Sequence, residues 1–168
     1  MSVELPTPDH VTADFVGEPG DRSFFIQAIE NAEVVNILVE KGQVAGLAEL
    51  LTELLGRVGS VPPSVWDVET MRLREPVVAR WRGGAIAVGI EPALGRFLIE
   101  VTEFVPPDEE REPDEARIWL SEEEAATLAA HAAWAVAQGR PTCRFCGLPL
   151  DEGEPHVCPR SNGDARHT

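Results

Sequence analysis

Four side chains that can bind a metal ion lie close together near the C-terminal end of the chain. They are Cys143, Cys146, His156 and Cys158, and they include all 3 cysteines of the sequence. Zn²⁺ takes thiolate and imidazole ligands in a tetrahedral shell, and four protein ligands leave no open position for a substrate. This spacing predicts a closed zinc site with a structural role.

The residues between these ligands favour the turns that such a site needs. Gly147 follows the Cys-x-x-Cys pair and can adopt a positive φ. Pro149, Gly153 and Pro155 separate the two ligand pairs and favour a reversing loop. Because the segment holds few apolar residues, bound metal would supply most of its folding free energy.

Three other interpretations of the cysteines stay open. A Cys-x-x-Cys pair can be a redox centre, usually at a helix N-terminus, but here it follows Gly139 and Pro141 at the end of a helical pattern. A disulfide framework is disfavoured because 3 cysteines leave one unpaired and the N-terminus MSVELPTPDH lacks signal-peptide features. The third alternative is a coincidental group of free thiols, since the His-x-Cys spacing departs from the commonest zinc-finger spacings.

Composition narrows the classes of function. The 168 residues carry a formal net charge of −15, which disfavours binding to a phosphate backbone by the surface as a whole. The hydrophobic fraction of 43% can build a core, and no apolar run approaches the roughly 20 residues that span a bilayer. We therefore expect a cytoplasmic protein without a membrane segment. The tail is less acidic, so contact with RNA or DNA through Arg144, Phe145 and Arg160 stays an alternative.

The rest of the chain contains an apparent internal repeat. The segment EPGDRSFFIQA, residues 18–28, resembles EPALGRFLIEV, residues 91–101, at an offset of 73. VVNILVEKGQVAGLA, residues 34–48, resembles EARIWLSEEEAATLA, residues 115–129, at an offset of 81. An insertion of eight residues in the polar loop VPPDEEREPDE accounts for the difference. Chance similarity between two amphipathic units is the competing interpretation.

Each copy has the pattern of three strands followed by one helix. In the first, apolar runs at 12–17, 23–29 and 34–39 precede a helical periodicity that ends near Gly59. In the second, AIAVGIE, RFLIEVTEF and RIWL precede a helix that Ser121 and Glu124 begin with a capping box and that runs to about Gln138.

These patterns predict an α+β fold built from two tandem strand-strand-strand-helix repeats. The repeats, at about 10–59 and 77–140, would form an antiparallel sheet with the helices packed on it. A linker at about 60–76 joins them within a domain of residues 1–140. Residues 141–168 form a small zinc-ribbon-like tail.

Outside the metal site, no constellation of catalytic residues is convincing. The GxGxxG and P-loop patterns are absent. His131 lies near the apolar face of the last helix and is expected in the core, whereas His10 is expected in a solvated N-terminal loop. Lys41, the only lysine, invites a functional role, but an exposed ion pair with Glu40 explains it equally well. Trp66, in the linker, is the tryptophan to examine for a partner contact.

Three segments resemble an actinobacterial family of unknown function: VGEPGDRSFFIQA, VVNILVEKGQVAGLAELLTELL and CRFCGLPLDEGEPHVCPRSNG. The family tail has the pattern CPxCGxPxDPxGHxCPRxNG, to which Cys143, Cys146, His156 and Cys158 correspond, followed by Pro159, Arg160, Asn162 and Gly163. This chain departs from the pattern at Arg144 and in the length of the loop before the histidine. The resemblance implies a cytoplasmic bacterial protein and brings no known activity.

The leading functional hypothesis is a non-enzymatic binding or regulatory protein with structural zinc, whose partner is a protein or a small ligand. The first alternative is an enzyme with its active site between the two repeats. The convergence of Lys41, an arginine and carboxylates there would favour it. Nucleic-acid contact through the tail is the second alternative.

Overall fold

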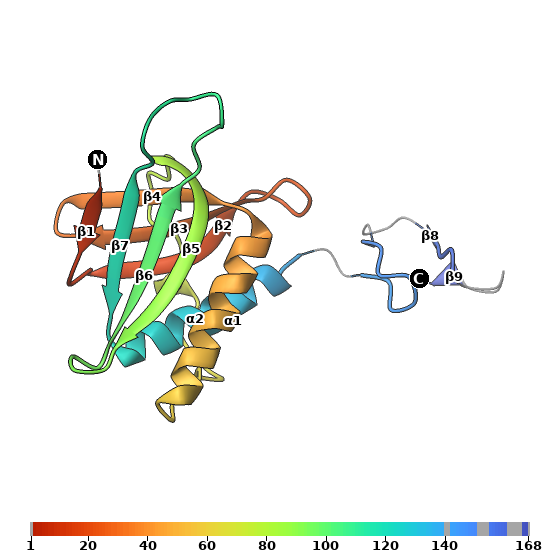
Figure 1. Ribbon diagram of the computed structural model, residues 1–168. Coiled ribbons are helices and arrows are strands. Elements are labelled where there is room, and N and C mark those ends of the chain that lie inside the picture. The colour runs from red at the N-terminus through yellow and green to blue at the C-terminus, as the bar shows by residue number, and fades with distance from the viewer. Residues whose placement is uncertain (1, 140–141, 151–154, 161–165, 168) are drawn as a thin grey trace.

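The chain alternates runs of strands with single helices (Figure 1). The computed structural model describes residues 2–139, 142–150, 155–160 and 166–167. In chain order, the elements are β1 (Val3–Leu5), β2 (His10–Val16), β3 (Ser23–Glu30), β4 (Glu33–Val39), α1 (Lys41–Arg57), the 3-10 helix η1 (Glu69–Met71), β5 (Trp81–Glu91), β6 (Arg96–Glu103), β7 (Glu115–Leu120), α2 (Glu122–Ala137), β8 (His156–Val157) and β9 (Arg166–His167).

Strands β1 to β7 form one seven-stranded sheet in the order β1-β7-β6-β5-β4-β3-β2. Strands β2, β3 and β4 pair antiparallel, as do β5, β6 and β7. However, β4 runs parallel to β5, and β1 runs parallel to β7. The expectation of an antiparallel sheet is therefore wrong in this respect, because the sheet is mixed. A parallel neighbour needs a long crossover, which α1 and the segment after it provide between β4 and β5.

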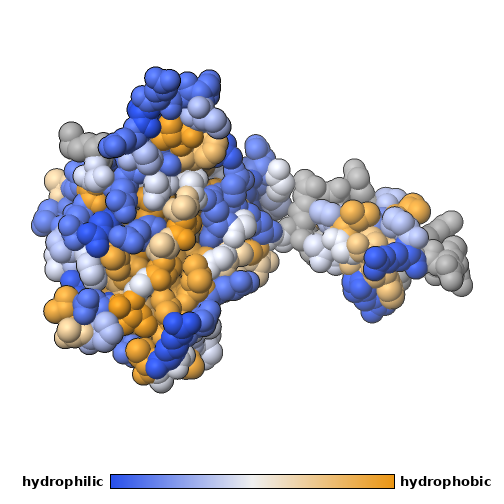
Figure 2. Space-filling view, viewed as in Figure 1, coloured by the Kyte–Doolittle hydropathy of each residue, from blue (hydrophilic) through white to orange (hydrophobic). Residues whose placement is uncertain are grey.

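The same order of three strands and one helix occurs twice. Strand β3 begins at Ser23 and β6 at Arg96, which reproduces the offset of 73, and α1 and α2 begin at the offset of 81. The additional residues lie between β6 and β7, where residues 104–114 project from the sheet and present a mainly hydrophilic surface (Figures 1 and 2). Strand β1 lies outside both units and was not expected; its Leu5 is fully buried.

One face of the sheet shares the hydrophobic core with both helices. Along β3, Phe24, Ile26 and Ala28 alternate with residues of the other face and lie opposite buried residues of β4. Helices α1 and α2 pack against each other and against the sheet. The fully or almost fully buried residues that the helices contribute are Val44, Leu47, Leu51, Leu55, Ala125, Leu128, Ala129, Ala132 and Ala135.

The opposite face of strands β2 to β4 carries a row of buried polar side chains. Thr12, Gln27 and Asn36 occupy paired positions on the three strands. The Gln27 side chain donates to the carbonyl of Arg74 at 2.9 Å and to Asn36 Oδ1 at 2.8 Å, and it accepts from the Arg74 amide at 2.8 Å. The chain at the end of the segment 60–76, expected as a linker, is thus bound to the sheet and satisfies polar groups that the sheet buries.

The helix boundaries follow local signals. Ser121 N–H donates to Glu124 Oε2 at 2.7 Å and Glu124 N–H donates to Ser121 Oγ at 3.1 Å, so the predicted capping box is confirmed. Beyond the end of α1, Gly59 has a φ of 77°. Pro141, expected to help end α2, lies outside the described residues. Among the described residues, no helix has the length and hydropathy that crossing a bilayer requires.

Candidate metal centre

Cys143 and Cys146 lie on a tight turn that its own backbone holds. The Cys143 amide donates to the carbonyl of Leu148 at 2.8 Å, and the Gly147 amide donates to the carbonyl of Cys143 at 2.8 Å. Gly147 has a φ of 74°, in the left-handed region that a glycine enters without a steric cost. The conformation expected of Gly147 is therefore confirmed.

The second ligand pair lies on and after a short strand. His156 begins β8, which pairs antiparallel with β9, and Cys158 follows with only 3% of its surface exposed. The loop glycine Gly153 and the tail residues Asn162 and Gly163 lie outside the described residues. The ligands therefore come from two local structures, a turn and a strand end, that meet at one point.

The four ligand atoms form one cluster. They all lie within 4.8 Å of one another. Cys143 Sγ is 3.7 Å from Cys158 Sγ, and Cys146 Sγ is 3.3 Å from His156 Nε2. A tetrahedral shell with Zn–S bonds of about 2.3 Å and Zn–N bonds of about 2.0 Å places its ligand atoms roughly 3.5–3.8 Å apart. The three thiols are free of disulfides, so the donor set and its spacing fit a metal such as zinc.

Local electrostatics favour the thiolate form of one of the thiols. The backbone amides of Cys146 and Phe145 donate to the Cys143 sulfur and lower the pKa of this thiol from 9.0 to about 6. The pKa of Cys146 is raised: the Leu148 amide lowers it, but burial and the neighbouring sulfur atoms outweigh that effect. Because the sulfur atoms repel one another when both are ionised, a cation held between them would favour the thiolate forms of both.

The aromatic and basic residues beside the metal ligands are exposed but engaged with each other. The Arg144 guanidinium lies 4.7 Å from the centre of the Phe145 ring, and 44% of Phe145 is exposed. Arg160 is exposed as well. In single-strand recognition a base stacks on such a ring face. In this structure Arg144 covers one face of the ring.

Two residues singled out from the sequence meet inside the body. His131 is fully buried, and its Nδ1 accepts a hydrogen bond from the Trp66 indole at 3.3 Å. Its Nε2 lies 3.6 Å from Asp14 Oδ1, which also accepts an ion pair from Arg72 at 3.1 Å. His131 thus lies in the core as expected, and the half-buried Trp66 contacts the chain's own helix.

The expectation that His10 lies in a solvated loop is wrong. His10 begins β2, with 6% of its surface exposed, and burial together with the charge of Arg74 lowers its pKa to about 4. The available signal was the alternation of His10, Thr12 and Asp14 in HVTADFV, which places all three on one face of a strand. Because the side chains of that face are polar, the sequence predicted that the face is exposed to solvent. In the structure, another segment of the chain covers the face and buries them.

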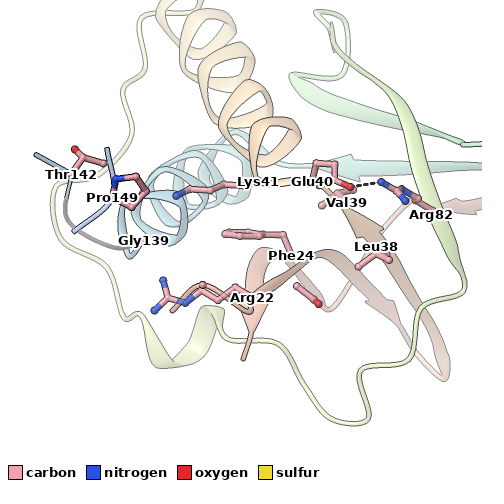
Figure 3. Close-up of a pocket in the computed structure, with 12 residues that line it drawn as sticks. Arg22, Phe24, Leu38, Val39, Glu40, Lys41, Arg82, Gly139, Thr142 and Pro149 are labelled. Atoms are coloured by element: carbon pink, nitrogen blue, oxygen red, sulfur yellow. Dashed lines mark hydrogen bonds and ion pairs between the residues drawn. The ribbon is translucent and has the colours of Figure 1, made fainter. Parts of the chain in front are cut away.

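A pocket of about 550 Å³ lies where the start of β3, the end of β4, the start of α1 and the end of α2 meet (Figure 3). Lys41, Arg22 and Arg82 line it, and of these three only the lysine stands out from the sequence. Glu40, the alternative ion-pair partner for Lys41, pairs with Arg82, and among the described residues no ion pair joins it to Lys41. The pocket thus brings Lys41, two arginines and a carboxylate together, between residues of both predicted repeats.

Comparison with known proteins places the chain in a family. No curated protein and no solved structure matches it. A family model described as "Protein of unknown function (DUF3090)" matches residues 3–158, which extend from β1 through Cys158. The chain therefore belongs to the DUF3090 family of proteins of unknown function.

Proposed function

We propose that the protein is a non-enzymatic binding or regulatory protein whose tail is stapled by a structural zinc ion. One observation supports this most directly: the ligand atoms of Cys143, Cys146, His156 and Cys158 lie within 4.8 Å of one another. Three sulfur atoms and an imidazole nitrogen are a donor set that zinc prefers.

The role of the metal follows from the number of ligands. Four protein ligands complete a tetrahedral shell, and catalytic zinc sites instead keep one position for water or substrate. Metal in this site would therefore fold the tail and leave reactivity and ligand binding to other parts of the chain. The reduced thiols that the site needs agree with a cytoplasmic location, and the tail pattern agrees with an actinobacterial origin.

We also infer that the body, residues 1–140, consists of two copies of one unit and that residues 141–168 form a separate zinc-binding tail. Two strand-strand-strand-helix units at the offsets of 73 and 81 support the duplication. A protein or small-ligand partner would then bind where the two units meet. Nucleic acid is disfavoured as the partner, because the net charge of the chain is −15 and Arg144 covers a face of the Phe145 ring.

An enzyme with its site between the units is the second candidate. The convergence of Lys41, Arg22 and Glu40 in one pocket favours it. Substrate turnover that Lys41→Gln abolishes, with an unchanged circular dichroism spectrum and zinc content, would select this candidate over the first.

Zinc analysis tests the leading proposal. The chain is purified under reducing conditions without chelator, and zinc per chain is measured by mass spectrometry. We expect one zinc per chain, and Cys146→Ser should lose most of it because the variant lacks one of four ligands. Thr142→Ser, which alters a neighbouring residue outside the cluster, is the matched control and should retain the metal. Folded, reduced protein without zinc would contradict the proposal.

A further inference from the structure

The pocket at the start of α1 concentrates positive charge in an acidic protein. Its lining includes Arg22, Lys41 and Arg82, and Glu40 is the one acidic residue that lines it among the described residues. The lining therefore carries two net positive charges, although the whole chain carries −15. Such a local field attracts anions against the field of the remaining surface.

The three cations are not equally available to a ligand. Arg82 already forms an ion pair with Glu40 at one side of the pocket (Figure 3). Arg22 donates from Nη1 to the carbonyl of Gln138, but its Nε is buried and has no hydrogen-bond partner within the described part of the chain. A buried donor without a partner costs free energy unless a ligand or water satisfies it.

Lys41 is held beside the end of the other helix. Its Nζ lies so close to Gly139 that a Cβ at that position would be 2.6 Å away. Within the described residues, no hydrogen bond or ion pair of Lys41 is found, and its side chain extends toward Gly139 across the pocket (Figure 3). The negative end of α2 favours an ammonium at this point, so the charge is kept near the pocket without being neutralised.

The backbone adds further donors. Lys41 is the first residue of α1, a helix of 17 residues, so the Lys41 and Gly42 amides have no acceptor within it, whereas Glu40 already caps the Gln43 amide. The positive end of this helix therefore coincides with the cationic side chains.

Part of the remaining lining is apolar. Phe24, Leu38 and Val39 line the pocket, and Phe24 lies between Arg22 and Lys41 (Figure 3). A volume of about 550 Å³ falls within the range of roughly 300–1,000 Å³ that is usual for small-molecule sites. An inorganic ion would leave this apolar surface uncovered, whereas an organic group would cover it.

We propose that this pocket binds a small organic phosphate monoester, with Arg22 and Lys41 on the phosphate and the organic group against Phe24. A phosphate monoester carries about −1.5 to −2 charges at neutral pH, which matches the two net positive charges of the lining. Arginine and lysine together with helix amides are the groups that bind phosphate in proteins. The inference rests on the proposed binding role. The charged residues of the lining belong to the body, and the tail adds Thr142 and Pro149 to it.

Calorimetric titration with phenyl phosphate tests this inference on the full chain at low ionic strength. We expect binding that weakens with added salt, with phenol, inorganic phosphate and benzoate all binding more weakly than phenyl phosphate. Equal affinity for inorganic phosphate would overturn the organic subsite, and equal affinity for benzoate would overturn the choice of phosphate. No detectable binding would overturn the inference as a whole.

Variants of the lining residues and of the far end of α1 locate the site. Lys41→Gln and Arg22→Gln should each weaken phenyl phosphate binding about tenfold, the usual loss for one hydrogen bond to a charged group. Arg57→Gln removes the same charge from the exposed far end of α1 and should change affinity less than about twofold. Equal losses in Lys41→Gln and Arg57→Gln would contradict a local site.

Two further measurements separate this inference from the proposed function. If Arg22→Gln fails to fold, the exposed Lys41→Gln variant still decides the outcome. Zinc per chain is measured on the same samples: loss of phosphate binding with zinc retained concerns the pocket alone, and zinc-free protein that still binds phenyl phosphate contradicts only the metal proposal.

Discussion

The body and the tail of this protein differ in what holds them together. The body buries apolar side chains from seven strands and two helices in one cluster. Among the described residues of the tail, the buried side chains are the two cysteines Cys143 and Cys158. Burial of apolar surface stabilises the body, whereas the described part of the tail has almost no apolar surface to bury. With the proposed zinc site, the stability of the tail would depend on the bound metal. The two regions should therefore respond to different perturbations.

Removal of metal should have the largest effect, and only on the tail. Structural zinc contributes on the order of 10 kcal/mol to the folding of small zinc modules, so a strong chelator should unfold the tail. Limited proteolysis should then cleave between the body and Cys158, while the thermal midpoint of the body by circular dichroism stays nearly constant. A large drop of that midpoint would show that the body depends on the metal too.

Truncation of the core should have the next largest effect, and only on the body. Leu51 of α1 is fully buried, so Leu51→Ala should lower the free energy of unfolding by about 2–5 kcal/mol in urea titration. The adjacent Leu50 is 40% exposed, and Leu50→Ala should cost less than about 1 kcal/mol. Zinc content should stay unchanged in both variants, and zinc loss in Leu51→Ala would contradict independent regions.

The polar face of the body should be the next most sensitive. Gln27→Leu preserves volume but leaves the amide and carbonyl of Arg74 without their partner, which should cost about 1–3 kcal/mol. Because Asn36 Oδ1 accepts from the same Gln27 side chain, the double variant with Asn36→Leu should cost less than the sum of the single variants. Additive costs from urea titration would mean that the two amides act independently.

Acidification should again act on the body. The pKa of His10 is lowered to about 4, so the unfolded chain, with a pKa near 6.5, binds the proton more readily. The stabilising contribution is full above pH 6.5 and is lost as the pH falls toward 4. His10→Gln should flatten the stability profile in this window, measured by urea titration at several pH values. Parallel profiles for the two proteins would contradict the burial of a neutral His10.

Much of the local structure could be predicted from the sequence. The three strands and one helix of each unit, the capping box at Ser121 and the turn at Gly147 all follow from patterns of a few residues. The clustering of the metal ligands follows from short spacing as well, because a turn needs only neighbouring residues to bring Cys143 and Cys146 together.

Other features depended on residues far apart in the chain. The parallel pairings of β4 with β5 and β1 with β7 have no local signal, because a strand carries the same alternation whichever way its neighbour runs. The sequence around His10 predicts an exposed residue. Its burial could not be predicted, because the segment that covers it lies more than 60 positions further along the chain. The ion pair of Arg82 with Glu40 could not be predicted either, because these two residues also lie far apart in the chain.

The sequence by itself determined the element types, the two-unit order and the metal donor set, because each depends on side-chain chemistry and short-range geometry. Only the tertiary structure decided the direction of the strands, the burial of His10 and the meeting of Arg22 and Lys41 in one pocket. Those outcomes depend on which distant surfaces pack together. A pattern read along one chain contains no direct measure of such packing.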